Sequence, residues 1–262
     1  MAVFPQLLTG ALVQFRFEKT LQGRAVLNRA MDASTYAAAD PGGRRVRWDL
    51  AFAGLSDAEF AALSALFAES EGRLNSFTFL DPAANLLGWT EDLSAAAWDK
   101  NPLLTVTGGV TGPSGDGFHL LNAGAGWSEV WQTLAAAPVG FAYAFSVWVR
   151  GTGIVRLRRF ASLDSAELTF SLSAAWKRVE LNGALNEGPL GVSFAIGLPA
   201  GGQVEMAGPQ VDGQLVAGEY RKSAGRGGIY SAARFAQDAL ESRVEAVNWI
   251  DARVSVESRF ED

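Results

Sequence analysis

Cysteine is absent from this chain and histidine occurs once, so most chemistry that needs either residue is excluded. Without cysteine there can be neither a disulfide framework nor a thiolate zinc site. The single histidine, His119, lies in the apolar stretch GFHLL, and nothing near it supplies a nucleophile, a base and an orienting group. A lone histidine between apolar neighbours is typical of a packed strand residue. The sequence therefore predicts no catalytic residues and a protein that is not an enzyme.

Long hydrophobic runs and an excess of positive charge are also missing. No apolar run approaches about 18 residues, and no basic-then-apolar segment opens the chain, so neither a membrane-spanning helix nor a secretory signal is predicted. The net charge is −6 and the pI is about 5.0. A nucleic-acid surface needs a basic patch that displaces counterions. We therefore expect neither nucleic-acid binding nor membrane insertion.

The acidic residues of the chain still allow one kind of metal site. Calcium takes hard oxygen ligands, which Asp, Glu and backbone carbonyls can supply. Four such residues lie in the middle of the chain, without the spacing of an EF-hand: Asp116, Glu129, Glu205 and Asp212. We predict no obligatory cofactor, with a calcium ion in this region as an alternative.

The chain is rich in glycine, with 29 residues, and in short Val/Leu/Phe alternations, which together favour β-structure with many turns. One long helix is predicted within Leu55–Leu87. Ser56 can cap its start and Glu59 completes a capping box. One apolar face follows at helical spacing: Phe60, Leu63, Leu66 and Phe67. Gly72 is predicted to end the helix, and residues 77–82 (FTFLDP) then form a short strand that stops at Asp-Pro.

The residues before this helix contain three predicted strands, at 12–17 (LVQFRF), 24–28 (RAVLN) and 44–52 (RRVRWDLAF). The turn sequence DPGG at 40–43 precedes the last of them. In that strand Val46, Trp48, Leu50 and Phe52 share one side, as expected of a half-buried antiparallel strand.

Beyond residue 85 the composition changes and strands recur at even spacing. They are predicted at 129–134, 141–150, 154–160, 168–172, 176–181, 192–198 and 203–211, with 108–117 (GGVTGPSGDG) as a loop. Such spacing indicates a sandwich or a jelly roll. In 141–150 (FAYAFSVWVR) one face is wholly apolar: Phe141, Tyr143, Phe145, Val147 and Val149.

Residues 221–233 (RKSAGRGGIYSAA) are predicted to be a linker, since glycine and serine dominate them. The remaining tail is too short to form a core of its own. We therefore predict a mainly β protein in three pieces. Residues 1–85 begin a β-sandwich domain with one helix, residues 86–222 are an inserted jelly-roll β-sandwich, and residues 223–262 hold the linker and the C-terminal strands that complete the first domain.

Six tryptophans fall in the predicted insertion: Trp89, Trp98, Trp127, Trp131, Trp148 and Trp176. Aromatic faces can stack on sugar rings, but large aromatics also fill sandwich cores. Trp148 lies between Ser146 and Arg150, opposite the apolar face of its strand, so alternation turns it outward. Trp127 lies beside Gly126 and Ser128, near a loop. Trp148 and Trp127 are therefore the candidate carbohydrate-binding residues.

The first part of the chain resembles minor tail proteins of tailed bacteriophages, of the distal-tail type. The resemblance rests on RWDLAF, on LSDAEFAALSALFAESEGRLNSFTFLDP, and on the residues Gly72, Arg73, Phe77, Phe79 and Asp81. It implies a structural β-domain that forms a ring between tail tube and baseplate.

Residues 85–222 are similar to the carbohydrate-binding-module-like jelly rolls of phage tail and baseplate proteins. Their boundaries are marked by Asn85, Leu86 and Leu87 at the start, and by Ala207 to Asp212 with Tyr220 at the end. The motifs of both resemblances are structural, and no ring-forming residue can be named from them.

Together these observations predict a structural component of a phage tail tip or baseplate whose jelly roll binds host-surface glycans. The expected partners are further copies in a ring, the tail tube and the hub. The expected location is the tail tip of the virion, after assembly in the host cytoplasm. The alternatives are a stand-alone carbohydrate-binding or adhesion module and a polysaccharide depolymerase.

Overall fold

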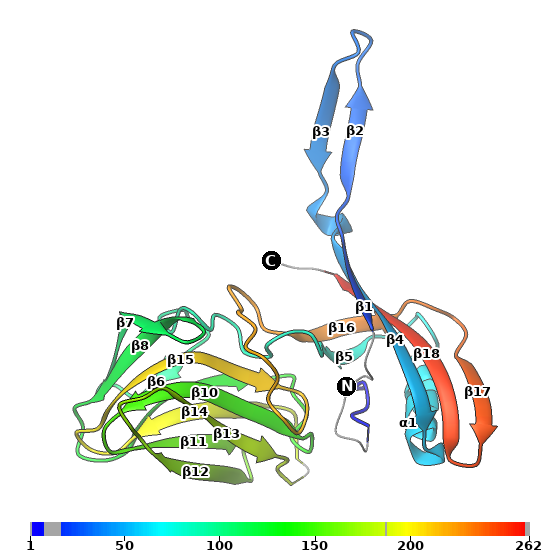
Figure 1. The fold of residues 1–262 in the computed structure, drawn as a ribbon. Helices are drawn as coiled ribbons and strands as arrows, with labels where there is room; N and C mark the ends of the chain where they lie inside the picture. The colour runs from blue at the N-terminus through cyan, green and yellow to red at the C-terminus, as the bar shows by residue number, and fades with distance from the viewer. Residues whose placement is uncertain (1, 8–16, 187, 260–262) are drawn as a thin grey trace. The chain divides into compact units, whose positions relative to one another are not determined.

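The computed structural model describes residues 2–7, 17–186 and 188–259. In these ranges the chain forms strands β1 to β18, one α-helix and one short 3-10 helix (Figure 1). It divides into two compact units. The terminal unit holds the described residues up to 79 together with those from 230 onward, and the central unit holds residues 80–229. No described helix is long and apolar enough to cross a membrane.

The predicted mainly β fold with one helix is confirmed. From the sequence we predict domain boundaries after residues 85 and 222. The boundaries between the two compact units lie instead after residues 79 and 229. The assignment of these pieces to a ring domain and an inserted glycan-binding module stays a prediction.

The terminal unit is built on one sheet that combines strands from both ends of the chain. Their order is β1 (Glu18–Gln22), β4 (Arg45–Leu55), β18 (Trp249–Arg259), β16 (Ile229–Phe235) and β5 (Phe77–Leu80), with β17 (Glu241–Ala246) paired to β18. β18 runs antiparallel to β4, from Ile250 opposite Leu55 to Arg259 opposite Arg45. The C-terminal strands thus complete the first domain, as predicted.

One face of this sheet is buried because its central strands alternate between apolar and polar residues. The predicted face of β4 is confirmed, since Val46, Trp48, Leu50 and Phe52 are all buried. β18 supplies Ile250, Ala252, Val254 and Val256 to the same core. The ring centroid of Trp48 lies 4.8 Å from that of Phe79 and 4.7 Å from that of Tyr230.

The helix α1 (Asp57–Glu69) packs on β4 and β18. Its predicted capping box is present: the Glu59 N–H donates to Ser56 Oγ at 3.2 Å, and the Ser56 N–H donates to Glu59 Oε2 at 2.9 Å. Leu63 and Leu66 are buried. At the other end the Gly72 N–H donates to the Phe67 carbonyl at 3.2 Å, with a φ of 62° that favours glycine.

Replacing the capping serine tests this account of the helix. We expect Ser56→Ala to lower the free energy of unfolding by about 1 kcal/mol, because the first helical N–H groups lose their acceptor. Ser64 lies inside the helix, so Ser64→Ala should change stability by only a few tenths of a kcal/mol. Urea denaturation of both variants measures the difference. Equal losses would contradict the role of the cap.

Between β1 and β4 the chain forms a hairpin of β2 (Ala25–Arg29) and β3 (Thr35–Ala39), which we call the arm. The two strands pair with each other and with no further described strand. Every residue of both is exposed, and Figure 1 shows the arm extending past the end of the sheet. A 3-10 turn, η1 (Pro41–Gly43), returns the chain to β4 at the predicted turn. The strand predicted at 12–17 falls almost wholly outside the described residues.

The central unit contains two five-stranded sheets. Sheet I has the order β13 (Lys177–Gly183), β10 (Tyr143–Gly151), β15 (Gln203–Asp212), β8 (Gly115–Asn122) and β7 (Leu104–Gly112). Sheet II has the order β12 (Ser165–Ser171), β11 (Ile154–Phe160), β14 (Val192–Leu198), β9 (Ser128–Leu134) and β6 (Asp99–Lys100). The inward side chains of both sheets form one hydrophobic core, as the predicted sandwich requires.

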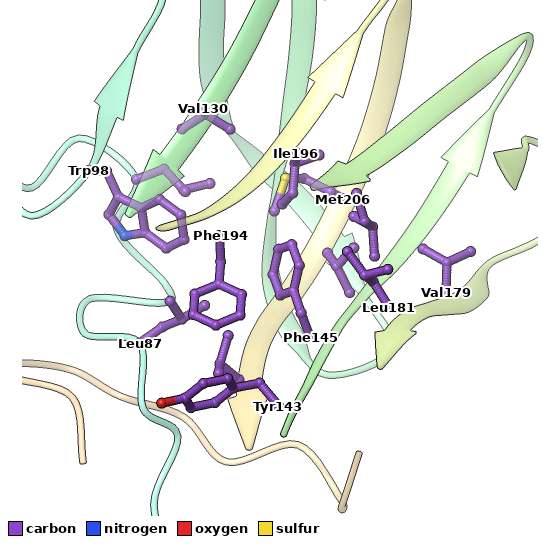
Figure 2. Close-up of a cluster of buried hydrophobic side chains, with 14 of the residues drawn as sticks. Leu87, Trp98, Val130, Tyr143, Phe145, Val179, Leu181, Phe194, Ile196 and Met206 are labelled. Atoms are coloured by element: carbon purple, nitrogen blue, oxygen red, sulfur yellow. The ribbon is translucent and has the colours of Figure 1, made fainter. Parts of the chain in front are cut away.

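Aromatic rings stand at the middle of this core (Figure 2). The Phe194 ring from sheet II lies 5.5 Å, between centroids, from each of Tyr143 and Phe145 of sheet I. Val147 and Val149 are also buried, so the predicted apolar face of this strand points inward. The neighbouring positions on the strand must then face outward.

A buried arginine ties the two sheets together at one end. Arg159 lies on β11 of sheet II and is only 1 % exposed. Its guanidinium donates to the carbonyls of Tyr143 at 3.3 Å and Ala184 at 3.1 Å, and also to that of Gly183. Removal from water lowers the pKa of Arg159. The carbonyl acceptors therefore compensate for burial of the charge.

The loop predicted at 108–117 is wrong, because these residues belong to the hairpin of β7 and β8. Glycine-rich strands lack the side-chain alternation by which strands are recognised. Here glycine permits close packing: a Cβ at Gly117 would lie 2.6 Å from the Met206 carbonyl oxygen on β15. A register shift between Gly108 and Val110 adds a bulge.

The linker predicted at 221–233 is also wrong. Its last five residues are part of β16, and the preceding ones are hydrogen-bonded to residues 85–90. The Trp89 N–H donates to the Gly225 carbonyl and the Thr90 N–H to the Ser223 carbonyl, both at 2.9 Å. The glycines here serve close backbone packing, not flexibility.

Candidate functional site

The two candidate tryptophans lie on different sheets. Trp148 is half-buried on the outward side of β10, between Arg178 of β13 and Ala207 of β15. Trp127 directly precedes β9 of sheet II and is 40 % exposed. The structure therefore does not bring them together, because the sandwich core lies between the two sheets. They cannot contact the same short ligand.

Two residues along β10 from Trp148, on the same outward face of sheet I, the strand register aligns a row of polar residues. Arg150 of β10 is opposite Glu205 of β15, which is opposite His119 of β8. These three residues line an open cleft of about 280 Å³, completed by Gly151, Thr152, Ala174, Gln203 and Val204. The sheet register thus places hydrogen-bond donors and acceptors one row from an aromatic ring.

Arg150 contacts two neighbouring side chains at this cleft. Its guanidinium forms an ion pair with Glu205, and its Cζ lies 4.7 Å from the centroid of the Trp176 ring. A guanidinium that is held by a carboxylate and an aromatic face keeps N–H groups free in a fixed direction. The arrangement can therefore offer oriented donors without rearranging.

A loop after β15 covers the same face on the other side of Trp148. Gln210 Nε2 donates to Asp212 at 2.8 Å, and the Arg221 guanidinium lies 3.2 Å from Asp212. Burial raises the pKa of Asp212 from its ordinary value. The Ala217 N–H donates to Glu180 of β13 at 2.8 Å. Trp148 thus lies between this loop and the cleft.

The ring of Trp127 is partly covered by a neighbouring side chain. The Cζ of Arg156 lies 4.2 Å from the centroid of the Trp127 ring. Arg156 in turn contacts Glu129 at 2.9 Å, and Arg158 also pairs with Glu129. One face of Trp127 is therefore covered by a guanidinium that a buried carboxylate holds in position. This leaves Trp127 less ring surface for a ligand.

The carboxylates considered for calcium do not share a site. Glu129 is on sheet II between two arginines, whereas Glu205 pairs with Arg150 and Asp212 with Arg221 on sheet I. Asp116 is at the start of β8. Over the described ranges, no group of three or more His, Cys, Asp or Glu side chains could hold a metal ion.

The cleft could not be recognised from the sequence, because strand pairing brings its residues together. His119 is a strand residue, as expected, but its side chain is half-buried at the cleft and not in the core. Arg150, Glu205 and His119 are far apart in the sequence, and only the pairing of three strands aligns them. The one available signal was alternation, which turns Arg150 outward together with Trp148.

No protein-family model matches the chain, and no curated protein matches it. Several solved structures resemble about half of it. The enzymatically active domain of tailspike protein 4 of bacteriophage CBA120 is 14% identical with a TM-score of 0.42, over 51% of this chain and 22% of that one. The match thus spans about a fifth of the tailspike chain.

Two carbohydrate-binding modules are also similar. TmCBM61, solved in complex with β-1,4-galactotriose, is 13% identical with a TM-score of 0.36, over 50% of this chain and 96% of that one. A xylan-binding domain of Xyn10C from Paenibacillus barcinonensis is 10% identical with a TM-score of 0.38, over 55% of this chain and 98% of that one.

Proposed function

We propose that the central unit binds a glycan on the outer face of sheet I. Trp148 is the aromatic platform, and Arg150, Glu205 and His119 are the polar groups that contact hydroxyls. The observation that carries the proposal is a half-buried tryptophan beside an open polar cleft on the same face. Ligand sites of this kind combine an apolar or aromatic surface with a few fixed polar groups.

The chemistry of the surface suits a sugar. The face of a sugar ring presents C–H groups, which pack on an indole, while its edge presents hydroxyls that donate and accept hydrogen bonds. Arg150 donates and Glu205 accepts, and each remains oriented by the other. Binding of this type needs neither a nucleophile nor a metal.

Replacing the platform tests the proposal. We expect Trp148→Ala to weaken binding of the glycan that the protein selects from an array by roughly 10- to 30-fold, because the apolar contact is lost. Isothermal titration measures the change. Trp148→Phe should keep part of the affinity, since a smaller ring remains.

The second tryptophan supplies the matched control. Trp127→Ala removes an equally large side chain from sheet II and should leave affinity unchanged. If Trp148→Ala binds as the unaltered protein does, or if only Trp127→Ala weakens binding, the proposed surface is wrong. Thermal unfolding of both variants shows whether either substitution has disrupted the fold.

We propose further that the terminal unit is a structural part of a phage tail tip, as a ring subunit that contacts the tail tube and the hub. Two features support this candidate: the resemblance of residues 1–87 to distal-tail proteins, and the exposed arm, whose apolar side chains suit a neighbouring subunit. The protein would then be located in the virion and assembled in the host cytoplasm.

Particle purification separates this candidate from a stand-alone binding module. The ring subunit should co-purify with virions and show a central pore in low-resolution images. A monomer that binds polysaccharide and is absent from particles would favour the stand-alone module. Turnover of host capsule or lipopolysaccharide, abolished by replacing one carboxylate, would instead indicate a depolymerase.

A further inference from the structure

The cleft on sheet I is lined by one cation and one anion, and these two groups are paired. Arg150 Nε donates to Glu205 Oε2, and the two side chains are 37% and 32% exposed, so both reach solvent. The other lining residues are uncharged while the imidazole of His119 is neutral; they are Gly151, Thr152, Ala174, Gln203 and Val204. In that state the charges that line the cleft cancel.

The ion pair leaves hydrogen-bonding capacity on both partners. Among the described residues, the terminal nitrogens of Arg150 donate to no protein group and Glu205 Oε1 accepts from none. One face of the guanidinium lies on the Trp176 ring, 4.7 Å from its centroid. A ligand in the cleft therefore meets donors and an acceptor side by side. A hydroxyl suits both, because it donates and accepts.

A sugar carboxylate suits these groups poorly. It only accepts hydrogen bonds, so it can use the N–H groups of Arg150 but not Glu205 Oε1. It would also lie beside the Glu205 carboxylate, and like charges that meet at a binding surface reduce affinity. Since Glu205 already offsets the charge of Arg150, little attraction remains to compensate for taking the ligand charge out of water. The net charge of −6 adds to the repulsion.

We infer that the cleft selects glycans by charge and that Glu205 is the residue that determines this selection. At about pH 8 the cleft binds an uncharged sugar and rejects the same sugar when it carries a carboxylate. This inference rests on the proposed glycan site and names the class of its ligand. Glu205 then has two roles, because it accepts from a hydroxyl and repels an anion.

His119 makes the selection depend on pH. It is the only histidine of the chain, and it lies on β8 opposite Glu205. Its partner on the other side is Thr107 of β7, so the charged groups of its row are Glu205 and, one strand further, Arg150. Histidine is the side chain that ordinarily gains a positive charge between about pH 8 and pH 5. Acidification therefore gives the cleft one net positive charge and admits a sugar carboxylate.

Paired oligosaccharides test the selection. Neutral oligomers of glucose, galactose and mannose are each compared with the same oligomer after oxidation of its primary alcohols to carboxylates. At about pH 8 the unaltered protein should bind the neutral member of its preferred pair at least about 10-fold more tightly than the acidic member. Glu205→Gln leaves Arg150 without its counter-charge. It should therefore bind the acidic member about 10-fold more tightly, with less than about a 3-fold change for the neutral member.

Glu167 on sheet II supplies the matched control. It also pairs with an arginine, since its carboxylate lies 3.2 Å from the guanidinium of Arg156, and it is 51% exposed. Glu167→Gln changes the net charge of the protein by the same amount as Glu205→Gln, but away from the cleft. It should leave the preference for the neutral member unchanged. Isothermal titration measures the affinities, and thermal unfolding shows that both variants are folded.

A change of pH tests the part of His119. Acidification from about pH 8 to about pH 5.5 should tighten binding of the acidic member by about 5-fold in the unaltered protein. His119→Gln retains hydrogen-bonding groups but cannot gain a charge, so its affinity for the acidic member should be equal at both pH values. A response that persists in His119→Gln would come from another group, such as the buried Asp212, and would overturn the role of His119.

The outcomes separate the charge selection from the glycan site itself. If the protein binds neither member of any pair, the proposed glycan site fails. If it binds glycans but takes the acidic member equally well at about pH 8, only the charge selection is overturned. Equal preferences in Glu205→Gln and Glu167→Gln would overturn it as well.

Discussion

Gly227→Ala is expected to destabilise the central unit by about 3 kcal/mol or more, because the added methyl group meets backbone that cannot move aside. A Cβ at this position would overlap the carbonyl oxygen of Leu86 and lie 2.6 Å from its carbonyl carbon. Residues 85–90 and 223–228 are hydrogen-bonded at this point, so either those bonds or the adjacent core must yield. Leu86 and Leu87 belong to that core.

The same segment contains the matched control. A Cβ at Gly225 would meet nothing within 4 Å, so Gly225→Ala should change stability by less than about 0.5 kcal/mol. Chemical denaturation, with hydrogen exchange at β15 amides to locate the loss, compares the two variants. Similar stabilities would mean that residues 221–228 are the flexible linker that composition suggests.

Phe194→Ala is expected to lower the free energy of unfolding of the central unit by about 3–5 kcal/mol, because it leaves a cavity where both sheets meet. The Phe194 side chain is fully buried and contacts the rings of Tyr143 and Phe145 (Figure 2). Denaturant unfolding followed by tryptophan fluorescence measures the loss.

Replacing an exposed apolar residue by alanine is the control for Phe194→Ala. Leu163 is 83% exposed, so Leu163→Ala should stay within about 0.5 kcal/mol of the unaltered protein. A loss below 1 kcal/mol for Phe194→Ala would contradict a single core shared by the two sheets. Loss of glycan binding together with the fold would be expected, since sheet I would no longer hold Trp148 and Arg150 in register.

Local patterns were sufficient to predict much of this fold. The capping box of Ser56 and Glu59 defined the start of α1, and alternation defined β4 and β10. These signals depend on nearest neighbours in the sequence. The completion of the first sheet by β18 followed from a different argument, that a short tail cannot bury its own apolar face.

Other features could not be predicted because they arise from tertiary contacts. At Gly117 and Gly227, backbone from a distant segment approaches too closely to leave room for a side chain. The sequence does not show these contacts, so the glycine-rich stretches around the two residues were predicted to be a loop and a linker. The cleft depends on the pairing of β10, β15 and β8, and no sequence pattern specifies that register. Outward alternation identified Trp148 and places Arg150 on the same face, but it could not reveal Glu205 and His119 as their neighbours.

The central claim, that the outer face of sheet I binds a glycan, is tested most directly by mapping the bound surface. Chemical-shift changes on titration with the selected glycan should be largest at Trp148, Arg150, His119 and Glu205. Changes confined to Trp127, Arg156 and Glu129 on sheet II, or no localised change at saturation, would contradict the claim.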